Sequence, residues 1–187
     1  MIAVGARTKL LGVIAVFVLP MVAAAIAYSG WRPQGHGNYG ELLEVAPLQQ
    51  TAGALADGTR FDLTALRGKW VMTYVGPSAC DADCTQLLYL MRQTRVAQGK
   101  EQSRIARLWI VSDAGTVAPE VVAQHPGLTV WRPQAPDLLR QFPDAASGAH
   151  LYLVDPLGNV MLRFPPQPDP YRLMKDLKLL LKASQIG

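Results

Sequence analysis

The sequence predicts an α/β domain with a mixed β-sheet, carried behind one N-terminal apolar helix. Short apolar runs rich in β-branched and aromatic residues alternate with segments whose apolar residues recur every three to four positions. This alternation is typical of strands joined by helices, and a hairpin followed by a helix closes the chain. Leu10–Ala27 carries no charge and is long enough to span a bilayer core.

The N-terminal run predicts a transmembrane anchor over residues 10–28, with residues 1–9 in the cytoplasm. Arg7 and Lys9 precede the run, and positive charge favours the cytoplasmic side. Ala25-Ile26-Ala27 also resembles a signal-peptide cleavage site, but the run exceeds the usual apolar region of about 7–15 residues. We therefore expect an uncleaved single-pass anchor in the inner membrane and a C-terminal domain in the periplasm.

Residues 29–47 contain Gly, Pro and Asn and few apolar residues, so they predict a linker before a domain at 48–187. His36 falls in this linker, and we assign it no function. The formal charge is +4 for the whole chain and +2 without Arg7 and Lys9. This mild charge, with no Lys/Arg block, argues against binding to nucleic acid.

The first half of the domain predicts a hairpin, a buried strand and a helix. Gly53–Leu55 and Arg60–Leu63 flank an Asp-Gly dipeptide, which is typical of a hairpin turn. Trp70–Val75 is a continuous apolar run, which predicts a strand buried on both faces. From Asp81 to about Gln98 the apolar residues fall on one helical face, and Gly99 ends the helix.

The second half alternates in the same way. We expect strands at 104–112, 128–131, 148–154 and 160–164, and helices at 119–124, 136–142 and 171–184. Asp155–Asn159 predicts a type I-like turn between the last two strands. The last helix is amphipathic, and its expected inward residues are Leu173, Leu177, Leu180 and Leu181.

Cys80 and Cys84 are the only cysteines, and they lie where the buried strand passes into the helix. In a helix this spacing separates the Cα atoms by roughly 6 Å, within reach of a disulfide or of one shared metal ion. A helix N-terminus favours thiolate, whereas Asp81 and Asp83 oppose it or cap the helix. The residues alone leave open a redox-active pair, a metal site and a structural disulfide, although cross-linking so short a loop stabilises little.

This layout resembles the thioredoxin fold, a three-layer sandwich, over about residues 48–183. Segments 57–63 and 66–70 and the hairpin motif at 152–158 look like the membrane-tethered branch of that superfamily. That branch includes the TlpA/ResA-type thiol reductases and the Sco copper chaperones of cytochrome c oxidase. Thiol reductases use Cys-x-x-Cys, whereas Sco proteins use the Cys-x-x-x-Cys spacing of Cys80 and Cys84, so the chain is most similar to Sco-type assembly proteins.

The resemblance implies copper as the metal, held by Cys80, Cys84 and a histidine. The Sco ligand histidine would fall near Ser147, and His150 is the histidine available, with an ordinary half-buried strand residue as its alternative role. Thiolates and imidazole suit Cu(I). The sequence departs from the Sco pattern at Thr85, where a proline is usual. The cis-proline of thiol reductases would fall near Ala149, where there is none.

The resemblance also implies a non-enzymatic metallochaperone that passes copper to a cytochrome c oxidase subunit or to another assembly factor. One alternative is a thiol–disulfide oxidoreductase of the TlpA/ResA type, in which Cys80 attacks and Cys84 resolves the mixed disulfide. The other is a non-catalytic assembly scaffold with a structural disulfide.

Overall fold

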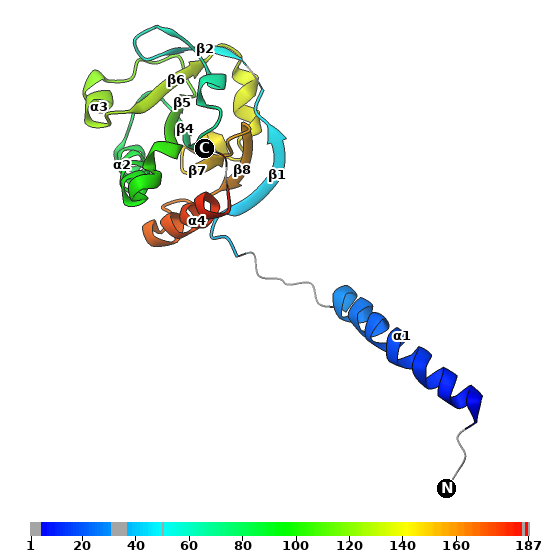
Figure 1. Cartoon of the computed structure of the whole chain (residues 1–187). Coiled ribbons are helices and arrows are strands. Elements are labelled where there is room, and N and C mark those ends of the chain that lie inside the picture. Colours follow the sequence, from blue (N-terminus) through cyan, green and yellow to red (C-terminus); the bar gives the residue numbers. More distant parts are fainter. Residues whose placement is uncertain (1–4, 31–36, 50, 185, 187) are drawn as a thin grey trace. The chain divides into compact units, whose positions relative to one another are not determined.

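Helix α1 (Ala6–Gly30) contains the apolar run (Figure 1). A computed structural model describes residues 5–30, 37–49, 51–184 and 186, and the chain divides into one unit at 1–37 and another at 38–187. Within α1, Arg7–Tyr28 has a mean hydropathy of 2.7 and is long and apolar enough to cross a membrane. Pro20 lies inside the helix, a position that membrane helices tolerate. His36, residues 1–4 of the predicted cytoplasmic segment and residues 31–36 of the predicted linker lie outside the described residues.

The second unit is built on one mixed eight-stranded sheet, in the order β1-β8-β7-β4-β5-β6-β2-β3. Neighbouring strands are parallel only between β4 and β5 and between β5 and β6. The other neighbours are antiparallel. The strands are β1 (Glu41–Pro47), β2 (Ala52–Leu55), β3 (Arg60–Asp62), β4 (Trp70–Gly76), β5 (Ile105–Val111), β6 (Leu128–Pro133), β7 (Leu151–Val154) and β8 (Asn159–Arg163).

Helices and 3-10 turns complete three layers, which confirms the predicted sandwich. The α-helices are α2 (Ala82–Ala97), α3 (Pro119–Gln124) and α4 (Pro170–Ala183), and the 3-10 helices are η1 (Leu63–Leu66), η2 (Gly99–Arg104), η3 (Pro136–Gln141) and η4 (Ala145–Ser147). Residues of α2, α3 and α4 pack in one apolar cluster on one face of the sheet. Residues of η1, η3 and η4 pack in a second cluster, which includes Trp131 and Tyr152, on the other face. The short helix predicted at 136–142 is therefore a 3-10 helix on the face away from α2.

The predicted linker at 29–47 is wrong for residues 41–47, because they form the edge strand β1. Glu41 pairs with Arg163 and Pro47 with Asn159, and the folded unit begins at Asn38 rather than Leu48. The residues of β1 are exposed or half-buried, so the strand has no alternating apolar face to predict it. Its stability comes from hydrogen bonds to β8, a strand far away in the sequence.

A buried carboxylate ties the start of this unit to α4. Asp176, only 3% exposed, accepts hydrogen bonds from the backbone N–H groups of Tyr39 at 2.6 Å and Gly40 at 2.8 Å. The Tyr39 hydroxyl accepts from the N–H of Asp169, and the guanidinium of Arg172 lies 4.3 Å from the Tyr39 ring centroid. These contacts fix the point at which the chain enters the sheet.

Candidate functional site

Cys80 and Cys84 lie where β4 ends and α2 begins, at the carboxyl edge of the parallel strands. Every residue of β4 is buried, and Pro77 then ends the strand. Asp81 is the N-cap of α2, and its carboxylate accepts a hydrogen bond from the N–H of Cys84 at 2.9 Å. The capping role that the sequence left open for Asp81 is therefore confirmed, and it fixes Cys84 in the first turn of the helix.

The two cysteines are joined by a disulfide, with their Cα atoms 5.2 Å apart. Cys84 is 2% exposed and belongs to the cluster under α2, whereas Cys80 is half-buried at its edge. An incoming thiol therefore reaches Cys80 first. The Thr85 hydroxyl donates to the Asp81 carbonyl at 2.8 Å, and its oxygen lies 3.7 Å from the sulfur of Cys80.

The turn after β5 braces the loop that leads to Cys80. The N–H of Ser78 donates to both carboxylate oxygens of Asp113 at 3.1 Å, and the N–H of Gly115 donates to the same carboxylate at 3.1 Å. Burial acts to raise the pKa of Asp113, but the hydrogen bonds from Ser78 and Gly115 and the charge of Arg132 together lower it. Asp113 directly follows the strand predicted at 104–112, and no role was predicted for it from the sequence. The signal that was missed is an Asp two residues before Gly, which is typical of an Asx turn.

A neutral phenol lies beneath this junction. Burial raises the pKa of Tyr74 to about 12, and the nearby carboxylates of Asp81 and Asp83 add to the effect. The Tyr74 ring packs against Trp109, with 6.0 Å between ring centroids. The charges near the cysteine pair are therefore the carboxylates of Asp81 and Asp83, with Tyr74 uncharged at ordinary pH.

His150 does not meet the cysteines in this structure. The neighbouring Leu151 packs in the same cluster as Cys84, on the α2 face of the sheet. The ring centroid of His150 lies 6.3 Å from that of Tyr152, a residue of the cluster on the opposite face. Its Nδ1 donates to the carbonyl of Phe164 at 2.7 Å. Across the described residues, no group of three His, Cys, Asp or Glu side chains could hold a metal ion. The expected set of Cys80, Cys84 and His150 is therefore not assembled while the disulfide is present.

A groove runs beside the cysteine helix. The groove has a volume of about 340 Å³. One wall is formed by α2, through Asp83, Gln86, Leu87 and Leu90. The other wall is formed by Ala149, before β7, and by residues 166–168 and 170, at the start of α4 and in the loop before it. The structure has no cis peptide bond in the part of the chain that it describes. The groove therefore offers a partner chain a surface along α2 that begins at Asp83, the residue before Cys84.

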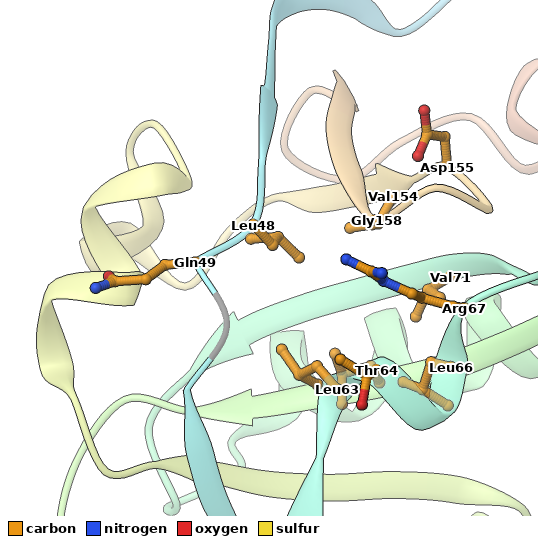
Figure 2. Close-up of a pocket in the computed structure, with 11 residues that line it drawn as sticks. Leu48, Gln49, Leu63, Thr64, Leu66, Arg67, Val71, Val154, Asp155 and Gly158 are labelled. Carbon is orange, nitrogen blue, oxygen red and sulfur yellow. The ribbon is translucent and has the colours of Figure 1, made fainter.

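A second, smaller pocket lies on the other face of the sheet (Figure 2). Leu48, Leu63, Leu66 and Val71 give it an apolar wall, and Figure 2 shows Arg67 beside them. Its volume of about 40 Å³ is far smaller than that of the groove beside α2. This pocket is separated from the cysteines by the sheet and adds nothing to their site.

Comparison with known proteins gives the family and the fold of this unit. A family model described as "Transmembrane-like, thioredoxin-like, C-terminal domain" matches residues 70–184. No curated protein matches the sequence significantly.

Solved structures of Sco proteins share the fold. Yeast Sco1 with copper bound superposes with a TM-score of 0.63 at 17% identity, over 76% of this chain and 96% of the yeast chain. Apo Sco1 from Thermus thermophilus superposes with a TM-score of 0.56 at 21% identity, over 80% of this chain and 98% of the Thermus chain. BsSco superposes with a TM-score of 0.55 at 13% identity, over 74% of this chain and 93% of the BsSco chain. It is described as having a disulfide switch and as a member of the Sco family of cytochrome c oxidase assembly proteins. At identities this low, the superpositions show a shared fold and nothing further.

Proposed function

This chain belongs to the transmembrane-like, thioredoxin-like C-terminal domain family. From its cysteine spacing and its structural similarity to Sco proteins, we propose a Sco-type role in cytochrome c oxidase assembly. In this role the Cys80–Cys84 pair binds copper or exchanges disulfides with a partner. One observation carries the proposal: a half-buried and a buried sulfur are joined at the first turn of α2, beside an open groove. A cross-link across so few residues contributes little to stability, which favours a chemical role for the pair.

The proposed location follows from α1. The helix anchors the chain in the inner membrane with its N-terminus in the cytoplasm, because Arg7 and Lys9 precede the apolar run. The thioredoxin-like unit then lies in the periplasm, an oxidising compartment in which the disulfide is the expected resting form. Partners are an oxidase subunit or another assembly factor at the same membrane.

The disulfide decides the order of events. Sulfurs bonded to each other are not thiolates, so copper binds only after a partner dithiol has reduced the pair. The partner thiolate attacks the sulfur of Cys80, the Cys80–Cys84 bond breaks, and Cys84 leaves as a thiolate that takes up a proton. The second partner thiol then releases Cys80, so that two electrons and two protons pass to this chain and the partner becomes a disulfide.

The reduced pair fits copper as a cargo. Two cysteine sulfurs close together form a soft donor set, which selects Cu(I). The proposal uses Cys80 and Cys84 alone, because His150 faces the other side of the sheet and its Nδ1 donates to Phe164.

A thiol–disulfide oxidoreductase without copper cargo is the second candidate. The half-buried Cys80 favours it, because this sulfur is open to exchange in the structure. The absence of a cis-proline at Ala149 argues against it, since that residue helps related reductases to bind substrate cysteines.

The test is a titration of the full-length chain, reduced and kept anaerobic in detergent, with Cu(I) in competition with a chromophoric chelator. We expect one equivalent to bind to the wild type and to an exposed control, Ser103→Ala, and none to Cys80→Ser or Cys84→Ser. Binding that survives the loss of both cysteines would refute the copper role. If the wild-type chain binds no Cu(I) but its disulfide exchanges with a dithiol, the oxidoreductase role is the one supported.

A further inference from the structure

Four cationic or titratable side chains gather at α2 and the sheet below it, and none of them has a carboxylate partner among the described residues. Arg107 lies in the middle of β5 and is only 3% exposed, although it interrupts an apolar strand. It faces the helices, because Ile105 and Trp109, its neighbours two residues away on either side, belong to the α2-side cluster. His125, 5% exposed, lies just after α3, and its neighbour Pro126 contacts Arg107.

The buried polar atoms of this group are mostly unpaired. Nη2 of Arg107 donates to the carbonyl of Pro126 at 2.5 Å. The Nε and Nη1 atoms of Arg107 and both ring nitrogens of His125 have no hydrogen-bond partner among the described residues. A guanidinium buried with two unused donor atoms is costly, because desolvation is not offset by a counter-charge.

Two more arginines, both on α2, add positive charge rather than compensating it. Arg92, which is exposed, places Nη1 3.4 Å from the carbonyl of Gln124, and Arg95 donates from Nε to the carbonyl of Ile105 at 2.9 Å. Burial, followed by the charges of Arg95 and Arg92, lowers the pKa of Arg107. Burial, followed by the charges of Arg107 and Arg92, lowers the pKa of His125. The ion pairs found in the described ranges involve Arg104, Arg140 and Arg163 instead.

We propose that this cluster is a binding site for a small phosphate-type oxyanion, held by Arg107 and His125 and reached from the surface past Arg92. A guanidinium presents donors in a planar fork that matches the oxygens of phosphate, and the unused Nε and Nη1 atoms of Arg107 supply such donors. Gly127 belongs to the turn that covers Arg107, and a Cβ added there would be in van der Waals contact with Nη2, at 3.6 Å. The site is independent of the cysteine pair.

The phosphate group has two sources for a membrane-anchored chain: inorganic phosphate and the head group of a phospholipid. The test uses the full-length chain in dodecyl maltoside micelles, which contain no phosphate, at constant ionic strength set with chloride. Thermal unfolding is followed during titration with inorganic phosphate, and separately with phosphatidylglycerol mixed into the micelles. We expect a saturable rise in the unfolding temperature in at least one arm, and the responding arm identifies the source.

Variants decide whether the response belongs to this cluster. Arg92→Gln should weaken the apparent affinity about threefold or more, because it removes a positive charge near the bound oxyanion. The control Arg60→Gln, an exposed arginine in the β2–β3 hairpin, should leave it unchanged. Arg107→Met should abolish the response and, without phosphate, unfold no earlier than the wild type, because it removes an uncompensated buried charge. If neither phosphate source raises the unfolding temperature, or if Arg92→Gln responds like Arg60→Gln, the proposal is overturned.

Discussion

The hydroxyl oxygen of Thr85 lies 3.7 Å from the sulfur of Cys80. In the Sco motif that the sequence resembles, a proline stands at this position. Thr85 gives the site two groups that proline lacks, namely an N–H that donates to the Asp81 carbonyl at 3.0 Å and a hydroxyl beside the exposed sulfur. The departure from the motif therefore changes the surroundings of Cys80 while keeping the first turn of α2 intact.

Thr85→Val is predicted to make the disulfide harder to reduce. In the reduced chain the hydroxyl can donate to the Cys80 thiolate, and a hydrogen bond to a charged group contributes about 1.5 kcal/mol or more. Valine has the same shape without the donor, so the reduction potential should fall by about 30 mV, a tenfold change in the exchange equilibrium. Equilibration with glutathione buffers measures this, with the exposed Thr116→Val as control. An unchanged potential would mean that the hydroxyl stays on the Asp81 carbonyl in both redox states.

His150→Ala is predicted to leave Cu(I) binding by the reduced chain within about threefold of the wild type, because its ring faces away from the α2 side. It should lower the free energy of unfolding by about 1 kcal/mol, through loss of the hydrogen bond to Phe164. Chelator competition and urea unfolding give the two values. A tenfold loss of copper affinity would restore His150 to the ligand set and require the start of β7 to rearrange on reduction.

Asp176→Ala is predicted to lower the free energy of unfolding by about 2–4 kcal/mol, because two N–H groups would lose a charged acceptor. Asp176→Asn, which keeps an acceptor oxygen, should cost less. Urea unfolding measures both variants, and hydrogen exchange should show faster exchange at Tyr39 and Gly40. The exposed Asp137→Ala serves as control. Unchanged exchange at Tyr39 and Gly40 would contradict the two hydrogen bonds that join these amides to Asp176.

The stability of the folded unit is predicted to fall between pH 10 and pH 12. Burial is the main cause that raises the pKa of Tyr74 and of Tyr152 to about 12, whereas an unfolded tyrosine ionises near 10. Below pH 10 both phenols are neutral whether the chain is folded or unfolded. Between pH 10 and 12 the unfolded chain releases protons that the folded chain keeps, so the free energy of unfolding decreases as the pH rises.

The variants Tyr74→Phe and Tyr152→Phe test the alkaline prediction. Each should flatten the decrease between pH 10 and 12, by an amount on the order of 2 kcal/mol per phenol. Urea unfolding at a series of pH values gives the slope, and absorbance near 295 nm follows tyrosinate in the folded chain. Two phenols that ionise near pH 10 in the folded state would contradict the burial argument.

Helices and strands that bury side chains at regular intervals were predicted from the local sequence pattern. The apolar run of β4 and the helical spacing of α2 were both identified, because each buries a regular set of side chains. β1 was missed because it is a nearly exposed edge strand, formed by pairing with β8. The face to which His150 belongs also escaped the sequence, since a shift of one residue in a strand reverses the side of the sheet.

Two buried charged residues stand at positions where the surrounding sequence pattern is apolar. Arg107 stands inside the apolar run of β5, and Asp176 lies beside Leu177 on the inward face of α4. A charged residue at an apolar position indicates a specific partner. The sequence could not identify the partners of Asp176, because the amides of Tyr39 and Gly40 are far from it along the chain. Arg107 donates to the distant carbonyl of Pro126, and its Nε and Nη1 atoms have no partner among the described residues.

The clamp between Asp176 and the start of β1 also has a mechanical consequence. Tension applied to the chain at Asn38 is carried first by the two amide hydrogen bonds to Asp176 and by the rungs between β1 and β8. Two strands, β8 and β7, separate that edge from β4, whose end carries the disulfide. Pulling at Asn38 therefore loads the β1 edge of the sheet and α4 before it loads β4.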